Sequence, residues 1–118
     1  MLPQNVLIVE DDVLVALDAE HLLERLGIRQ TRRAVRLTEA LEVLRMQAFD
    51  FGILDVNLGG ETVFPVADAM IARGIPFVFA SGYGRLPAMA SRFAHVPLLA
   101  KPYDGDLLRD AMLAEDRR

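Results

Sequence analysis

Short apolar segments recur along the chain at intervals of about 20 to 25 residues. These segments are Asn5–Val9, Arg29–Val35, Phe51–Leu54, Phe77–Ala80 and Leu98–Ala100. Four of them are almost continuously apolar, which is typical of parallel strands buried on both faces of a sheet. The second is weaker and basic. We interpret it as an edge strand whose charge discourages pairing with other chains, in preference to a polyanion-binding patch.

Helical patterns separate the apolar segments. The apolar positions of the first two helices have the spacing of a helix that buries one face. They are Val15, Ala19, Leu22 and Leu26 in the first helix, and Leu37, Ala40, Leu41 and Leu44 in the second. The third helix is predicted over Val63–Arg73 and the short fourth helix over Pro87–Ala94. The fifth begins after Asp104, a favourable N-cap, and we expect it to bury Leu107, Leu108 and Ala111.

Strand and helix patterns alternate five times, which predicts an α/β fold of the (βα)5 type. Helical crossovers of this length favour an open, doubly wound parallel sheet. The chain has 118 residues and shows no linker or low-complexity segment, so we predict a single domain over residues 1–118.

Composition narrows the class of protein further. The chain is 53% hydrophobic and 25% charged, as expected for a folded domain, and it contains no cysteine. No apolar run approaches the roughly 20 residues of a membrane helix, and the N-terminal segment lacks a basic leader. With a net charge of −4 and no long basic block, we expect a cytoplasmic protein that binds neither membrane nor nucleic acid directly.

Polar residues follow four of the five predicted strands. They are Glu10, Asp11 and Asp12 after the first, Asp55 after the third, Ser81 after the fourth and Lys101 after the fifth. Ligands of doubly wound sheets bind outside the carboxyl ends of the strands, so these side chains should meet in one cleft. Asp12 is instead suited to cap the first helix, because acidic groups are favourable at helix N-termini.

Several carboxylates in one cleft repel one another, and a Mg²⁺ ion bound by oxygen ligands relieves that repulsion. A lysine and a hydroxyl group beside the ion would complete a site for an anion. Transfer of a phosphoryl group to a carboxylate requires both the metal ion and the lysine–hydroxyl pair. We therefore expect Asp55 to act as a nucleophile at the end of its strand, compensated by the metal and by Lys101.

Four short motifs in this order resemble bacterial two-component response-regulator receiver domains: "VLIVEDD", "ILDVNLGG", "FVFASGYG" and "LLAKPYD". The resemblance covers the chain from end to end. It implies a flavodoxin-like fold with strand order 2-1-3-4-5.

The resemblance also implies roles for individual residues. Asp55 would accept a phosphoryl group from a phosphohistidine. Glu10 and Asp11 would form the acidic pair, with Asp11 preferred as the direct Mg²⁺ ligand. Asp55 and the backbone carbonyl of Asn57 would also bind the metal.

On the opposite side of the phosphoryl group, Ser81 would donate a hydrogen bond to it and Lys101 would pair with its charge. The Lys101–Pro102 bond is expected to be cis. Asn57 and Tyr83, each two residues after a key side chain, would influence how fast the phosphoryl group is lost.

One position departs from most receivers. The aromatic residue that changes rotamer on activation usually lies three residues before the lysine, and here that residue is Leu98. The segment Phe79–Tyr83 resembles a subfamily with the sequence Phe-Ala-Thr-Gly-aromatic (FATGUY-like), with Ser81 in place of Thr. We hypothesise that Tyr83 takes over part of the missing readout.

The resemblance implies a phosphorylation switch, not an enzyme acting on separate substrates. Its partners would be a sensor histidine kinase or a histidine phosphotransfer protein, and a downstream protein target. Three alternatives stay open: an adapter that binds partners without phosphorylation, a phosphate sink, and a small-substrate phosphatase resembling haloacid dehalogenases. The last is disfavoured because its Asp-x-Asp motif belongs on the first strand. The oligomeric state is not indicated.

Overall fold

The computed structural model describes residues 2–82 and 87–116. Its main sheet contains β1 (Asn5–Val9), β2 (Gln30–Ala34), β3 (Phe51–Asp55), β6 (Phe77–Ser81) and β7 (Leu98–Ala100). Its helices are α1 (Val13–Arg25), α2 (Leu37–Met46), α3 (Phe64–Ala72), α4 (Pro87–Arg92) and α5 (Gly105–Asp116). A small hairpin pairs β4 (Asn57–Leu58) with β5 (Glu61–Thr62).

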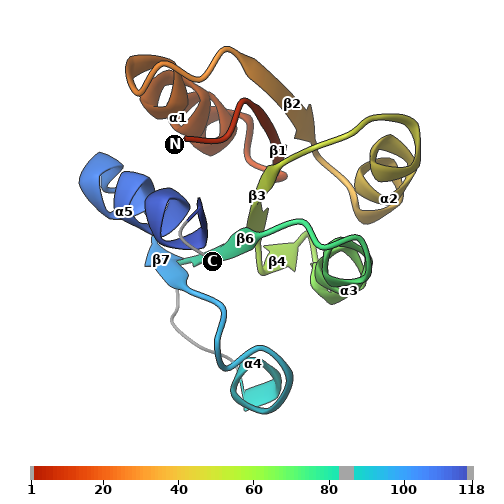
Figure 1. Ribbon diagram of the computed structural model, residues 1–118. Helices are drawn as coiled ribbons and strands as arrows, with labels where there is room; N and C mark the ends of the chain where they lie inside the picture. Colours follow the sequence, from red (N-terminus) through yellow and green to blue (C-terminus); the bar gives the residue numbers. More distant parts are fainter. Residues whose placement is uncertain (1, 83–86, 117–118) are drawn as a thin grey trace.

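The strand order is β2-β1-β3-β6-β7, and every pairing in this sheet is parallel. Counted along the five long strands, this is the order 2-1-3-4-5, so the predicted flavodoxin-like, doubly wound α/β fold is confirmed. Helices α1 and α5 cover one face of the sheet, and α2, α3 and α4 cover the other (Figure 1). Order reverses between β1 and β3, which places a crevice at their carboxyl ends.

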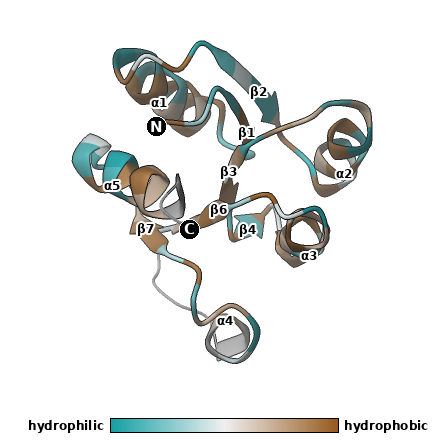
Figure 2. Ribbon diagram, in the orientation of Figure 1, coloured by the Kyte–Doolittle hydropathy of each residue, from teal (hydrophilic) through white to brown (hydrophobic). Residues whose placement is uncertain are grey.

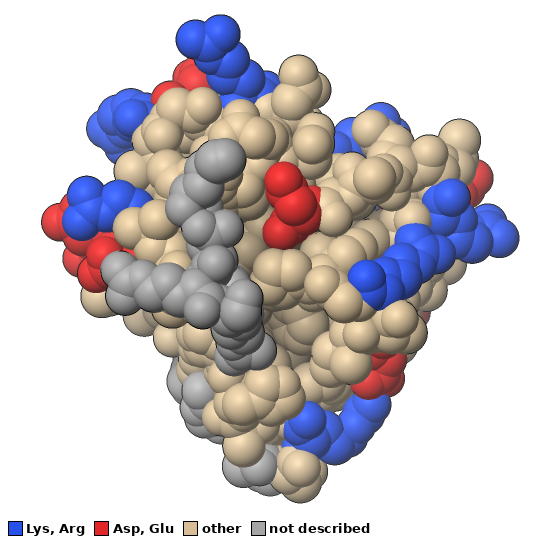
Figure 3. All heavy atoms as spheres, in the orientation of Figure 1, with Lys and Arg blue, Asp and Glu red and all other residues tan. Residues whose placement is uncertain are grey.

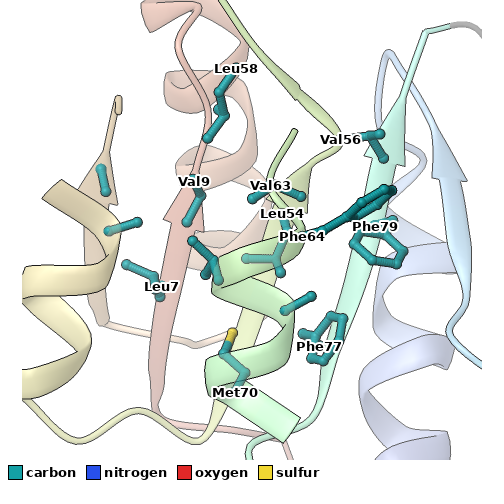
Figure 4. Packing of buried hydrophobic residues seen from close by; sticks show 14 of the residues in the cluster. Leu7, Val9, Leu54, Val56, Leu58, Val63, Phe64, Met70, Phe77 and Phe79 are labelled. Carbon is teal, nitrogen blue, oxygen red and sulfur yellow. The ribbon is translucent and has the colours of Figure 1, made fainter. Parts of the chain in front are cut away.

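Two hydrophobic cores lie on opposite faces of the sheet, and alternate residues of β1 enter each. Val6 and Ile8 pack toward α1 and α5, whereas Leu7 and Val9 pack toward α2 and α3. In Figure 4 the second core includes Phe64, Phe77 and Phe79, whose rings meet edge to face at centroid distances of 5.5 to 5.9 Å. Burial on both faces explains why the central strands are almost wholly apolar.

Strand β2 is an edge strand, as its basic sequence predicted, and it is markedly more hydrophilic than β3 or β6 (Figure 2). Arg33 pairs with Glu20 of α1 at 2.9 Å. On the face shown in Figure 3, basic side chains lie at several separate places around the rim and do not form one patch. The edge position of β2 and the pairing of Arg33 with Glu20 favour the edge-protection interpretation over a polyanion site.

Helix ends follow the sequence signals closely. Asp12 caps α1 by accepting hydrogen bonds from the backbone N–H groups of Leu14 and Val15. Asp104 caps α5 in the same way, accepting from the N–H groups two and three residues further on. In α3, Pro65 occupies the first turn and Gly74 follows the helix with a left-handed φ of 69°.

The structure differs from the sequence predictions in three details. Leu107 is exposed, whereas Leu108 is buried as predicted, because the helix that Asp104 caps turns about 100° per residue and directs Leu108 and Met112 to the same inward side. In α1 the fully buried residues are Ala16, Ala19 and Leu23, while the other predicted positions are partly buried beside them. Helix α4 ends at Arg92, two residues before the predicted Ala94.

In the described part of the chain, none of the helices combines the length and apolar composition needed to cross a bilayer.

Candidate functional site

A hollow of about 560 Å³ opens at the carboxyl ends of β1, β3, β6 and β7. It is lined by Glu10, Asp11, Asp12, Asp55, Asn57, Gly59, Ser81, Gly82 and Lys101. The structure therefore brings together all the site residues predicted after the strand ends. Tyr83, predicted to influence readout and phosphate loss, lies outside the described residues.

The sheet fixes the backbone beneath each of these side chains. The N–H of Glu10 donates to the carbonyl of Ala34 at 3.0 Å, which extends the pairing of β1 with β2. Asp55 is the last residue of β3 and lies opposite Ala80 of β6. The N–H of Lys101 donates to the carbonyl of Ser81 at 3.1 Å. Each functional side chain thus begins from a rigid ladder, which limits its positional freedom.

Glu10, Asp11 and Asp55 form a compact acidic cluster. One carboxylate oxygen from each lies within 4.8 Å of the others, Glu10 and Asp55 are buried, and Asp11 is exposed. Hard oxygen donors at this spacing fit a small divalent cation, and Mg²⁺ commonly binds through one or two carboxylates while keeping several waters. The exposed Asp11 leaves one side of the cluster open to solvent, as such a hydrated ion needs.

Lys101 supplies the positive charge that faces two of the acids. Its Nζ lies 3.0 Å from Glu10 Oε1 and 3.2 Å from Asp55 Oδ2. Burial alone lowers the pKa of Lys101, but its hydrogen bond to Glu10 and the two negative charges outweigh burial and raise the pKa. The ammonium group therefore stays charged, which an anion-binding role requires.

Glu10 shows the cost of placing this cluster inside the protein. Burial, and then the neighbouring Asp55 carboxyl group, raise the pKa of Glu10 from 4.5 to about 7, against the opposing hydrogen bond from Lys101. Its other oxygen accepts a hydrogen bond from the N–H of Asp12 at 3.2 Å. The single positive charge of Lys101 does not fully compensate the negative charges of the acidic cluster.

The loop after Asp55 forms the β4–β5 hairpin, which the sequence analysis missed. Gly59 and Gly60 occupy its turn with φ of 56° and 94°, and the N–H of Gly60 donates to Asn57 Oδ1 at 3.0 Å. A Gly-Gly pair between short strands is a known signal for a two-residue hairpin turn and could have revealed it. The hairpin fixes Asn57 at the rim of the hollow.

Tyr103 was also missed. It is buried between the sheet and the helices α1 and α5, and its hydroxyl group has no hydrogen-bond partner among the described residues. Burial, and then the negative charges of Glu10, Asp55 and Asp18, raise its pKa. It stands two residues after Lys101 in the motif "LLAKPYD", where only the lysine and proline drew attention.

The remaining predicted positions are placed as follows. Ser81 is buried at the end of β6, and Leu98 is half-buried at the start of β7, packed against the core that contains Phe79. The predicted cis bond between Lys101 and Pro102 is confirmed.

Comparison with known families identifies this arrangement. Residues 6–113 match the family model of the response regulator receiver domain. The chain belongs to this family. No protein in the curated collection matches the receiver at a significant level.

Solved structures support the same family and fold. The receiver is 40% identical to SdrG from Sphingomonas melonis Fr1, with 95% of each chain covered and a TM-score of 0.83. It is 42% identical to the BeF3-activated conformation of SdrG from Pseudomonas melonis Fr1, with 95% of this chain and 94% of that chain covered and a TM-score of 0.77. The PhyR response regulator REC domain of Erythrobacter litoralis, at 22% identity, shares the fold with a TM-score of 0.84 over 97% of this chain and 90% of that chain.

The raised pKa of Glu10 predicts a pH-dependent stability change. Because its pKa in the folded state exceeds the unfolded value, its stabilising contribution is complete below about pH 4.5 and is lost as the pH rises through about 7. The substitution Glu10→Gln removes the ionisable group, and with it the loss of stability at high pH. Without divalent metal, we expect the variant to exceed wild type in free energy of unfolding by on the order of 2 kcal/mol at pH 8 and by much less at pH 5.

Urea unfolding in EDTA at both pH values measures this difference. Glu42→Gln on the exposed side of α2 is the matched control and should change stability little at either pH. An equal effect of Glu10→Gln at both pH values would show that burial of this charge is not the cause.

Proposed function

We propose that this receiver is a phosphorylation switch, in which Asp55 accepts a phosphoryl group from a histidine kinase or a histidine phosphotransfer protein. The observation that supports this most is the position of the Asp55 carboxylate. It is buried at a strand end, 3.2 Å from the Lys101 ammonium group, beside two further carboxylates in a hollow open to solvent. Asp11, Asp55 and the Asn57 carbonyl would hold Mg²⁺, which supplies positive charge to the phosphoryl oxygens when bound.

In the proposed reaction an Asp55 carboxylate oxygen attacks phosphorus. A phosphorus–oxygen bond forms, the bond from phosphorus to the donor histidine nitrogen breaks, and that nitrogen keeps the electron pair. Lys101 is placed to turn from Glu10 toward the new phosphoryl oxygens, and Ser81 to donate its hydroxyl hydrogen to one of them. The chain thereby changes its own covalent state and transforms no separate substrate, so we do not expect it to be an enzyme in the usual sense.

The added charge would bias the position of the segment that follows Ser81, and with it α4. The receiver matches the SdrG structure with a TM-score of 0.83 and the BeF3-activated SdrG conformation with 0.77. The second of these relatives was solved in a BeF3-activated conformation, and because BeF3⁻ imitates a phosphoryl group this supports phosphoryl chemistry in the present receiver. We retain the hypothesis that Tyr83 replaces the aromatic readout missing at Leu98, and the FATGUY-like subfamily stays a prediction from the residues Phe79–Tyr83.

The adapter alternative is less well supported, because an adapter has no need for a cluster as unfavourable as Glu10, Asp11 and Asp55. A phosphate sink would use the same chemistry and differ only in lacking a downstream target. Asn57, held at the rim by Gly60, and Tyr83 are proposed to influence the rate of phosphoryl loss. A cytoplasmic location, where kinase domains act, remains part of the proposal.

The phosphoryl donor must cover the rim of the hollow, and the rim continues into an apolar surface on α1. Asp12 lines the hollow, and it is followed at once by Val13 and Leu14, which are 52% and 78% exposed. Leu17, one turn further, is 36% exposed. Exposed apolar clusters commonly mark protein interfaces, so we propose that the donor protein docks here.

Phosphorylation is tested by intact-mass spectrometry after incubation with acetyl phosphate and Mg²⁺. We expect wild type to gain one phosphoryl mass, because Asp55 is reachable through the open hollow. The gain should vanish in Asp55→Asn, which keeps the shape but removes the nucleophile, and in the presence of EDTA. The assay is repeated with phosphorylated donor proteins, because some receivers accept a phosphoryl group only from their kinase. A wild-type chain that stays unmodified by all donors would favour the adapter.

If the donor protein docks on α1, Leu14→Ala should slow phosphoryl transfer from a donor protein without affecting transfer from acetyl phosphate. Loss of a central apolar contact commonly costs a protein interface about tenfold in affinity. We therefore expect Leu14→Ala to slow transfer from a phosphorylated donor protein about tenfold, and to leave the rate with acetyl phosphate unchanged. Met46→Ala, 76% exposed at the end of α2, is the matched control. Equal transfer rates for Leu14→Ala and Met46→Ala would place the docking surface elsewhere.

A further inference from the structure

Helix α4 packs on the core through the buried Met89, and the residues at its C-terminal end contact α3 through one buried and one exposed interaction. The ring of Phe93, directly after α4, is buried with its centroid 5.2 Å from that of Phe64 and 5.3 Å from that of Phe79. At the surface, Arg92 Nη2 lies 2.6 Å from both carboxylate oxygens of Asp68 in α3.

The two contacts form one unit. Phe64 and Asp68 are four residues apart on α3, so they lie on the same side of that helix, and Arg92 and Phe93 are neighbours in sequence. The guanidinium carbon of Arg92 lies 4.9 Å from the centroid of the Phe93 ring. The ion pair therefore covers the aromatic contact from the solvent side.

The opposite end of α4 is connected to the proposed phosphorylation site. Only five residues separate Ser81, at the rim of the hollow, from Pro87, where α4 begins. A shift of Ser81 toward a phosphoryl group on Asp55 would act on this end of α4, and the contacts of Arg92 and Phe93 with α3 would oppose the movement. The buried rings resist separation, because parting them exposes apolar surface. The exposed ion pair is the weaker contact and can break at low cost.

We propose that the Asp68–Arg92 ion pair is a latch that favours the unphosphorylated position of α4 and opens when the site carries a phosphoryl group. This inference rests on the proposed function. The side chains of Asp68 and Arg92 are each half exposed, so the latch shifts the equilibrium modestly. From the strength of exposed ion pairs, we expect its loss to tighten binding of a phosphoryl mimic two- to fivefold.

The experiment measures the apparent affinity for BeF3⁻ in the presence of Mg²⁺, by NMR titration of backbone amides. The variants are Asp68→Asn, Arg92→Gln, the combination of both, and the charge exchange Asp68→Arg with Arg92→Asp. Arg109→Gln is the matched control, since Arg109 has similar exposure but its ion pairs lie within α5. Thermal unfolding of each variant checks that the fold is intact.

We expect each single variant to bind BeF3⁻ two to five times more tightly than wild type, and the combined variant no more tightly than the singles. The affinity of the charge-exchanged variant for BeF3⁻ should return toward that of wild type. The control Arg109→Gln should bind BeF3⁻ with the same affinity as wild type. The latch would be overturned if Asp68→Asn bound BeF3⁻ no more tightly than wild type, or if the effects of the two single substitutions added in the combined variant. The proposed switch would still stand in that case, provided that wild type binds BeF3⁻. Failure of wild type to bind BeF3⁻ at all would overturn the proposed function, and the latch with it.

Discussion

Lys101 holds together a site that would otherwise repel itself. Its ammonium group lies 3.0 Å from Glu10 and 3.2 Å from Asp55, while Asp11 completes the acidic cluster. One positive charge faces three carboxylates, so the site is under-compensated. Burial of Glu10, and then its neighbour Asp55, raise the pKa of Glu10 in spite of Lys101. Such a site gains free energy from any additional cation, and the same lysine is available for an incoming anion. We therefore expect the site to favour binding of a cation, at some expense to the stability of the metal-free receiver.

The fold is what makes this concentration of charge tolerable. Parallel pairing brings the ends of β1, β3, β6 and β7 to one edge, and two cores on opposite faces of the sheet hold them rigidly. The hydrophobic burial of those cores offsets the electrostatic cost at the edge. Helix α4 and the residue after it join this rigid frame through Met89, Arg92 and Phe93. In the proposed switch, a change at the edge reaches this surface helix without disturbing the sheet.

Much of this arrangement could be predicted from the sequence, because periodicity and strand ends obey simple rules. Continuous apolar runs indicated the buried strands, and the polar residues after them, such as Asp55 and Lys101, indicated the site. Side-chain orientation within a helix was harder, because one residue of rotation moves Leu107 from the core to the surface. The β4–β5 hairpin has strands too short to show a pattern of alternation, so its Gly59-Gly60 turn was the one local signal for it. The burial of Tyr103 and the contact of Asp68 with Arg92 depend on distant residues that no local pattern connects.

The most direct test of the under-compensated site is the unfolding temperature of the receiver as MgCl₂ is added at constant ionic strength. A ligand that binds only the folded state stabilises it by about 1.4 kcal/mol at ten times its dissociation constant. We expect the unfolding temperature of wild type to rise by several degrees and to keep rising with the logarithm of the Mg²⁺ concentration above its dissociation constant. This rise should be strongly reduced in Asp11→Asn and in Asp55→Asn. An unfolding temperature that does not respond to Mg²⁺, or that responds equally in all three proteins, would contradict this expectation.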